Sequence, residues 1–372
     1  MRSRFEGYRG SRPPLLRSAL AAFCVAFPIG LVTGAPSAAV AHRSPAQSPA
    51  ESSAGLFGSE QLLELTLETD FSVILKDRSP ESQYRPATLS YVGVDGSPVT
   101  LDIKVKTRGI FRLNPINCQF PPLMLNFAKK DAEHTLFADQ DKVKLVTHCR
   151  NRDPDYEQYV LQEYLVYRTF NLFTDKSFHV RLASMRYIDK SGKNEPLTKY
   201  AFLLEDEGAM AARNGAQVSD APGGQQEDFD STYMGLVTLF QYLMGNTDWT
   251  VRVAHNIKII RDSLGVHFGV PYDFDWSGVM ETKYARPAPQ LEIHTVRRRL
   301  YRGYCRTEEG FRALFSPFLE RKDAIYSLYR NLEGLSPKKL QQTLEYLDEF
   351  YETINDRNAI KQEFLRACRS GT

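Results

Sequence analysis

Four polar side chains between residues 245 and 278 have the types and order of a phosphoryl-transfer site: Asp248, Asn256, Asp273 and Asp275. Carboxylate and amide oxygens suit Mg²⁺, which takes one or two carboxylates together with phosphate oxygens and water. In kinases an Asp lies near the acceptor hydroxyl, and an Asn and a second Asp further along the chain hold the metal. The order here therefore predicts metal-assisted phosphoryl transfer, although the step from Asp248 to Asn256 is longer than in the kinase catalytic loop.

The segments that carry these side chains predict a β-hairpin. Residues 255–261 and 266–272 are β-rich runs, and residues 262–265 have the composition of a turn. A hairpin brings its two ends together, so we expect Asn256 to lie near Asp273. A helix over residues 231–244, with Ser231 as N-cap and Gly245 as its end, would deliver Asp248.

Two other interpretations of these residues remain open. Asp and Asn are common in turns and at strand ends, where they hydrogen-bond to nearby backbone without any function. Paired carboxylates are also the catalytic groups of glycosidases, in which Asp248 and Asp273 would act as acid and base. Against the first interpretation, Asp273 and Asp275 alternate with Phe274 and Trp276. A carboxylate among bulky apolar groups is costly unless it has a partner.

The remaining pattern predicts a β-rich first half and a helical second half. Alternating apolar residues indicate strands near 63–68, 87–92, 99–106, 123–127, 142–147, 182–188 and 200–204. Helices are expected at 153–173, 307–318, 322–332 and from 336 onward, and a mobile loop at 214–228. The fold class this predicts is α+β: a two-lobed chain with a β-rich N-lobe at 61–205, a mainly helical C-lobe at 206–372 and a cleft between the lobes.

The N-terminus has the features of an export signal. Several arginines precede an apolar run at 18–32, and residues 39–41 (AVA) resemble a cleavage site, so residues 1–41 are predicted to be a signal peptide. An uncleaved anchor is the alternative. Residues 42–60 are predicted to be a disordered linker, and no later segment is long and apolar enough to span a membrane. The expected location is periplasmic, cell-surface or extracellular.

Cysteine content and charge agree with an exported protein. Outside the signal the chain has Cys118, Cys149, Cys305 and Cys368. An even number of cysteines in an exported chain permits two disulfides, with three possible connectivities. The 372 residues have a net charge of +2, 42% hydrophobic and 25% charged residues, the composition of an ordinary globular protein. This balance gives no support to a nucleic-acid partner, and the sequence does not indicate the oligomeric state.

Several short motifs resemble those of the spore-coat protein H (CotH) kinase family, atypical kinases with a protein-kinase-like fold. The resemblance covers roughly residues 99–278, and its most specific motifs are the two around Asp248 and Asp273. The motifs are residues 106–109 (KTRG), 121–127 (PPLMLNF), 144–146 (KLV), 163–165 (EYL), 202–205 (FLLE), 245–249 (GNTDW) and 271–276 (PYDFDW).

The resemblance implies a role for each matching residue. Asp248 would be the catalytic base, Asn256 and Asp273 metal ligands, and Asp275 an auxiliary ligand or a residue that orients the others. Arg108 and Gly109 would belong to the turn that covers the phosphates, Glu205 would lie where the hinge meets adenine, and Glu163 would pair with the nucleotide-binding lysine. Met124 and Asn126 stand where family members carry basic residues, so that lysine would be Lys104, Lys106 or Lys144.

The functional hypothesis is an exported kinase. It would transfer the γ-phosphoryl of ATP to a hydroxyl of a protein or surface polymer, with Mg²⁺ or Mn²⁺ as the metal. The alternative is a scaffold or pseudokinase, which retains the cleft for binding without transfer. The altered strand at Met124 and the scarcity of ATP outside the cytoplasm favour this alternative.

Overall fold

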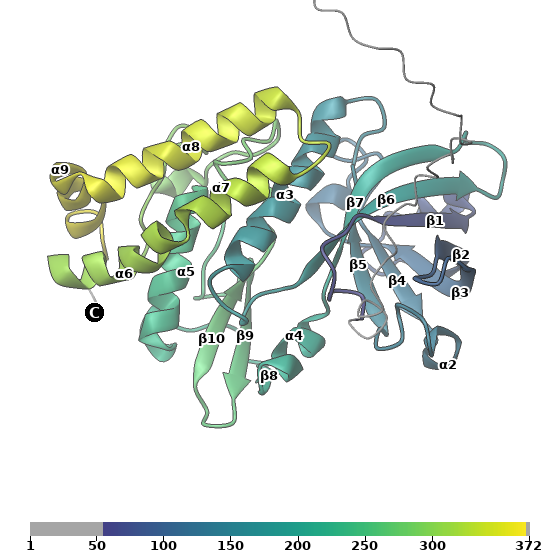
Figure 1. The fold of residues 1–372 in the computed structure, drawn as a ribbon, viewed down its shortest axis with the longest axis horizontal. Coiled ribbons are helices and arrows are strands. Elements are labelled where there is room, and N and C mark those ends of the chain that lie inside the picture. Colours follow the sequence, from purple (N-terminus) through teal and green to yellow (C-terminus); the bar gives the residue numbers. More distant parts are fainter. Residues whose placement is uncertain (1–54, 370–372) are drawn as a thin grey trace, which may run out of the picture. The chain divides into compact units, whose positions relative to one another are not determined.

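A computed structural model describes residues 55–369, which belong to one compact unit. The predicted signal peptide and residues 42–54 of the predicted linker lie outside the described residues. Within them the elements follow one another from a β-rich first part to a second part that is mostly helical (Figure 1).

The alternating apolar residues of the first part form a barrel. Its strands pair in the order β1-β2-β3-β4-β5-β7-β6, and β1 also pairs in parallel with β6, which closes the sheet (Figure 1). Leu67, Leu89, Val105 and Leu125 are completely buried, as expected for side chains that fill the interior of a small barrel. The strands are β1 (Leu63–Thr69), β2 (Arg85–Val92), β3 (Pro98–Thr107), β4 (Leu123–Phe127), β5 (Lys142–Val146), β6 (Val180–Asp189) and β7 (Leu197–Leu204).

The predicted two-lobed, protein-kinase-like fold, with a β-rich N-lobe and a helical C-lobe, is therefore wrong. The first strands form a closed barrel of mixed pairing, and the second part contains a sheet of its own. The sequence pattern located the strands correctly. It could not predict that β1 pairs with β6. The alternation of apolar and polar residues specifies which face of a strand is buried, but not which distant strand lies beside it.

Two long helices supply much of the hydrophobic core outside the barrel interior. Helix α3 (Pro154–Asn171) packs against β6, β7 and α7 (Lys322–Asn331), and Glu163 lies within it. Helix α5 (Ser231–Met244) is almost entirely buried, and its N-cap is Asp230, not the predicted Ser231, because the Asp230 carboxylate accepts the N–H of Tyr233. The other helices are α1 (Phe71–Ile74), α2 (Lys129–Ala132), α4 (Glu207–Arg213), α6 (Glu308–Glu320), α8 (Pro337–Asn355) and α9 (Arg357–Ile360).

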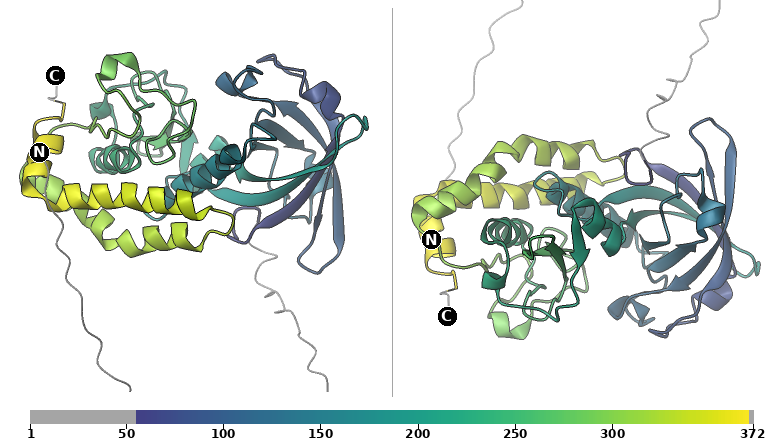
Figure 2. Two further views of the ribbon diagram at one scale, coloured as in Figure 1. Left: turned by 90° about the horizontal axis from the view of Figure 1, so that it is seen from above. Right: turned by 90° about the horizontal axis from the view of Figure 1, so that it is seen from below.

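A second sheet of three strands holds the predicted hairpin. Strands β9 (Ile257–Asp262) and β10 (His267–Pro271) pair antiparallel, as predicted. Strand β8 (Ala216–Val218) adds to β9, so part of the segment predicted to be a mobile loop is ordered. Helices α7 and α8 run side by side (Figure 2).

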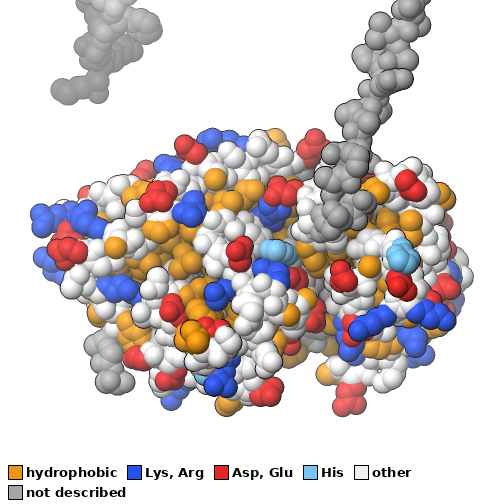
Figure 3. Space-filling view, turned by 60° about the horizontal axis from the view of Figure 1, so that its bottom comes forward, with side chains coloured by type: hydrophobic (Ala, Val, Ile, Leu, Met, Phe, Trp, Pro, Cys, Tyr) orange, Lys and Arg blue, Asp and Glu red, His pale blue; other side chains and the backbone are white. Residues whose placement is uncertain are grey.

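Two disulfides join the four cysteines of the described chain, Cys118 with Cys149 and Cys305 with Cys368. Disulfides form and persist in oxidising compartments, so this pairing supports an exported environment. Among residues 55–369 no helix is long and apolar enough to cross a membrane. On the face drawn in Figure 3, basic and acidic side chains are interspersed.

One histidine is buried in its neutral form. His148 follows β5, is fully shielded from solvent and packs against the rings of Phe120 and Tyr187. Its Nε2 lies 2.7 Å from Oδ1 of Asn151. Burial lowers the pKa of His148 from 6.5 to about 4.

This shift predicts a stability that falls in acid. Between pH 6.5 and about 4 the unfolded chain binds a proton at His148 that the folded chain does not bind. The contribution of the neutral, buried His148 to the free energy of unfolding is therefore complete above pH 6.5 and is lost as the pH falls. The loss should be on the order of 3 kcal/mol. Urea denaturation across this pH range should show it in the native protein and not in His148→Gln, which does not titrate. Identical pH profiles in the two proteins would contradict the assignment.

Candidate functional site

A cavity of about 870 Å³ lies where one end of the barrel faces the hairpin of the second sheet. The ends of β3, β5 and β7 reach its wall through Arg108, Val146 and Leu204. Apolar and polar side chains both line the cavity; the apolar wall includes Pro122, Val146, Leu204 and Tyr272, together with Ile110, Phe111, Val253, Ala254 and Trp276. Seven residues that the sequence singled out are part of this wall: Arg108, Gly109, Glu163, Asp248, Asn256, Asp273 and Asp275.

Asp248 is held in place by the end of α5 and by its own neighbours. The helix ends at Gly245 in a left-handed conformation, where the hydroxyl of Tyr346 leaves no room for a side chain. Asn246 then accepts the backbone N–H of Asp248 through its side-chain oxygen at 3.0 Å. The buried helix thus fixes the backbone from which the Asp248 carboxylate projects.

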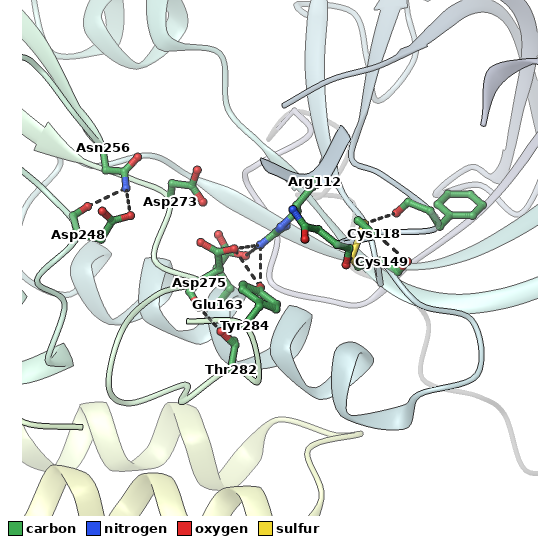
Figure 4. A network of polar contacts seen from close by, with 12 residues as sticks. Arg112, Cys118, Cys149, Glu163, Asp248, Asn256, Asp273, Asp275, Thr282 and Tyr284 are labelled. Atoms are coloured by element: carbon green, nitrogen blue, oxygen red, sulfur yellow. Dashed lines mark hydrogen bonds and ion pairs between the residues drawn. A yellow bond between two sulfur atoms is a disulfide. The ribbon is translucent and has the colours of Figure 1, made fainter. Parts of the chain in front are cut away.

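The carboxylate of Asp248 is oriented by two side chains and remains half-buried. Nε2 of His255 lies 2.9 Å from one of its oxygens, and the amide nitrogen of Asn256 donates to the other at 3.0 Å. The same nitrogen also donates to the carbonyl of Asp248 at 2.7 Å. Because both bonds use its nitrogen, the amide oxygen of Asn256 points away from Asp248 (Figure 4).

The hairpin places Asn256 and Asp273 at its two adjoining ends, as the sequence predicted. Ile257 pairs with Pro271, and the N–H of Tyr272 donates to the carbonyl of Asn256 at 3.1 Å. Both residues adopt left-handed backbone conformations, with φ of 51° at Asn256 and 60° at Asp273. Such conformations cost energy for any residue except Gly, least for Asn and Asp, and they collect at functional sites.

A buried network lies beside Asp273. Nη2 of Arg112 is 2.6 Å from the carboxylate of Asp275 and 3.5 Å from that of Glu163 (Figure 4). The hydroxyl of Tyr284 donates to Asp275 at 3.0 Å, and Thr282 donates to its carbonyl at 2.9 Å. Asp275 and Glu163 are both buried, so the guanidinium compensates charges that would otherwise be costly.

The acidic groups of this region exceed the positive charge that Arg112 supplies. Burial raises the pKa of Glu163, and the charges of Asp275 and Asp273 add to the rise against the effect of Arg112. Surrounding protein and the charge of Asp275 likewise raise the pKa of Asp273. Its side chain is open to the water of the cavity, which screens part of this effect. An additional cation at Asp273 would be favoured.

These donors fit a hard divalent cation only in part. Among residues 55–369 no three His, Cys, Asp or Glu side chains are arranged to ligate a metal by themselves. Asp273 and the amide oxygen of Asn256 are the oxygens that could contact Mg²⁺ or Mn²⁺. The remaining positions would belong to water and phosphate, as is usual for Mg²⁺.

Arg108 is the residue of the wall whose charge is least compensated. Its side chain makes no hydrogen bond or ion pair with the residues that the structure describes, and only its backbone N–H is bonded, to Pro122. Burial lowers the pKa of its guanidinium, while the charge of Asp273 acts in the opposite direction. A desolvated guanidinium that lines a cavity favours an anionic ligand.

Lys106 and Lys144, two of the lysines proposed for the phosphates, are not among the residues that line the cavity. Lys106 is 5.0 Å from the centre of the Tyr84 ring. Lys144 is 3.7 Å from the carboxylate of Glu207, and burial and the charge of Arg108 lower its pKa. The cation that meets Glu163 is instead Arg112, an arginine that the sequence analysis overlooked.

Glu205 is also outside the wall. Arg213 donates to it at 2.8 Å, and it accepts the N–H of His179 at 2.8 Å. It therefore stabilises the end of β7, and the preceding Leu204 faces the cavity in its place.

Sequence reasoning missed Arg112, Tyr284 and Tyr167. The hydroxyl of Tyr167 accepts the N–H of Asp273 at 2.9 Å. The only signal for Arg112 was its position shortly after Arg108 and Gly109. Nothing in the local sequence connects Arg112 or Tyr284 to Asp275, since pairing of this kind arises only in the folded chain.

Comparisons with known proteins do not assign the chain to a group. No protein-family model matches the sequence, and no curated protein matches it either. The resemblance to the CotH kinase family rests on the short motifs alone.

The strained backbone at Asn256 can be tested by stability. Asn256→Ala and Asn256→Gly both remove the hydrogen bonds to Asp248, but only the alanine retains a Cβ in the left-handed region. We expect Asn256→Gly to be the more stable variant by about 1 kcal/mol, the reverse of the usual order. Chemical denaturation of the two variants measures the difference. A more stable alanine variant would contradict the observed conformation.

Proposed function

We propose that the cavity binds a nucleoside triphosphate with Mg²⁺ or Mn²⁺ and that the protein transfers the γ-phosphoryl to a hydroxyl of an exported protein or surface polymer. The observation that carries this proposal is the wall itself. Arg108, which has no ion pair among the described residues, and Asp273, which favours an added cation, line the same space. A metal-bound polyphosphate complements both charges at once.

Each side chain would have a limited task. Arg108 and Arg112 would bind phosphate oxygens, Asn256 and Asp273 would contribute oxygens to the metal, and Asp248 would accept the proton of the attacking hydroxyl. The metal, when bound, would offset charge on the phosphate oxygens. Asp248 suits its task because it is partly exposed and held by His255 and Asn256.

The apolar part of the wall supports a ligand with a ring system. Val146, Leu204, Pro122 and Tyr272 line the cavity together with the polar groups. Pockets for small molecules and cofactors are typically built this way, with apolar wall and few polar anchors. A base would lie against these side chains while its phosphates extend toward Arg108.

The proposal rests on the site and not on the fold. A closed barrel differs from the fold that the family resemblance implied, and one chemistry can occur on unrelated folds. The motifs that resemble those of CotH kinases contain Asp248 and Asp273, and they support the proposal to that extent.

One observation favours binding without transfer as a second candidate function. Arg112 pairs with both Asp275 and Glu163, so an arginine rather than a lysine meets the helix glutamate. If Arg112 stayed in this network when a nucleotide bound, its charge would be shared with two carboxylates and would offset the charge of the phosphates only in part. The protein would then be an exported scaffold or pseudokinase.

Separate measurements of binding and transfer distinguish the two functions. Asp273→Asn retains a residue that tolerates the left-handed backbone, and it should weaken Mg²⁺-dependent binding of a non-hydrolysable ATP analogue by about tenfold or more. Asp248→Asn should bind the analogue within about threefold of the native protein and lose transfer by about 100-fold or more.

The matched control is Asp220→Asn, which changes an exposed carboxylate away from the cavity and should leave both activities unchanged. Native binding that resists chelation of the metal, or equal binding in Asp273→Asn and native protein, would contradict the proposed metal site. Binding without transfer to any hydroxyl acceptor would favour the scaffold.

A further inference from the structure

A short segment borders the cavity at its start and brings Arg112 into the site. We call residues 109–118 the strap; it follows β3 and ends at Cys118. Near its start, Phe111 packs against Trp276 at 5.5 Å and Tyr284 at 5.6 Å between ring centres. Arg112 follows directly and forms the network with Asp275.

Little of the strap is held by burial. Ile110 is 89% exposed and Ile116 is 78% exposed, and Leu113 is a buried apolar residue of the segment. A segment with few buried apolar contacts opens at low free-energy cost unless its ends are fixed. Besides the contacts of Phe111 and Arg112 themselves, the position of Arg112 therefore depends on what holds the far end of the strap.

That far end is anchored by a disulfide and by backbone contacts. Cys118 is bonded to Cys149 just beyond β5, and the N–H groups of Gln119 and Phe120 donate to the carbonyl of Cys149 at 3.0 and 2.8 Å. Arg78 donates to the carbonyls of Cys118 and Gln119 at 3.0 and 2.6 Å. The disulfide thereby ties the strap to the strand whose last residue lines the cavity.

Arg112 also has donors to spare. Its three hydrogen bonds to described residues, to Glu163, Asp275 and Tyr284, all use Nη2. Nε and Nη1 have no partner among the residues described, and the side chain is part of the cavity wall. A guanidinium held in this way can offer the remaining donors to an anion without leaving its carboxylates.

We propose that the Cys118–Cys149 disulfide is a positioning element of the site, which sets the affinity of the cavity for a polyphosphate by holding Arg112 in place. The inference rests on the proposed binding of a nucleoside triphosphate and adds a determinant of its affinity. Without the disulfide the strap samples more conformations, and binding must then order it.

The second disulfide is a matched control. Cys305–Cys368 has the same Cα–Cα distance of 4.9 Å, and neither of its cysteines belongs to the strap. The sequence separations are 31 and 63 residues, so removal of either disulfide should lower stability by comparable amounts. A loss of affinity confined to one of them would reflect position and not stability.

The test compares Cys118→Ser/Cys149→Ser with Cys305→Ser/Cys368→Ser in the full chain. The probes are tripolyphosphate alone and a non-hydrolysable ATP analogue with Mg²⁺, measured by calorimetry. We expect the dissociation constants to rise about tenfold or more in the first variant and to stay within about twofold in the second. Trp276, which contacts Phe111, should change its fluorescence in the first variant alone.

A coupling measurement separates positioning from general loosening. Arg112→Lys should weaken tripolyphosphate binding clearly in the native background and much less in Cys118→Ser/Cys149→Ser, because the displaced strap no longer presents the side chain. Equal effects of Arg112→Lys in both backgrounds would overturn the proposal. So would native affinity in the variant without the first disulfide.

If that double variant does not fold, Cys118→Ala/Cys149→Gly takes its place, since it leaves no unpaired hydroxyl in this buried site and Gly suits the left-handed backbone at residue 149. Its affinity should likewise fall by about tenfold or more; native affinity in this variant would overturn the proposal. Polyphosphate binding that depends on the disulfide, without transfer, would refute the kinase and leave this inference standing. Phosphoryl transfer with equal polyphosphate affinity in all variants would support the kinase and refute the role of the disulfide. Absence of any polyphosphate binding would overturn both the proposed function and this inference.

Discussion

The contact between Arg112 and the carboxylates of Asp275 and Glu163 is the interaction on which the geometry of the site depends. It joins three parts of the chain that are far apart in sequence: the strap after β3, helix α3 and the segment after β10. A buried carboxylate without its partner is costly, so each part holds the others in place. A buried ion pair of this kind serves to specify an arrangement more than to add stability.

The charges around this contact are distributed unevenly across the cavity. Asp275 and Glu163 are compensated by Arg112. Asp273, whose side chain faces the cavity, has no ion pair among the described residues, and neither has the guanidinium of Arg108. A ligand that brings both a cation and an anion would satisfy both sides. Such electrostatic complementarity selects a ligand by its charge pattern and not by its size alone.

The backbone near the cavity is organised before any ligand arrives. Asn256 and Asp273 hold left-handed conformations at the two adjoining ends of a hairpin, and Asp248 is fixed by the end of a buried helix. Rigid elements of this kind present side chains with little freedom to lose on binding. The strap is the contrasting case, since it is exposed and depends on its disulfide.

The local sequence determined most of the strands and helices and indicated seven of the residues that line the cavity. Alternating apolar residues identified the strands, the turn at residues 262–265 identified the hairpin, and the hairpin predicted that Asn256 and Asp273 would be neighbours. These inferences succeeded because they depend on contacts between residues close in the chain. The four cysteines likewise indicated two disulfides but not their pairing.

Tertiary structure alone decided the closure of the barrel through β1 and β6, the position of Glu205 outside the cavity and the partner of Glu163. Each depends on a contact between distant segments. Periodicity reports which side of an element is buried, but it carries no information on which remote element covers that side. Arg112 is the clearest example of a residue whose partners the sequence could not predict. It can pair with Glu163 and Asp275 only after the strap, α3 and the segment after β10 have come together.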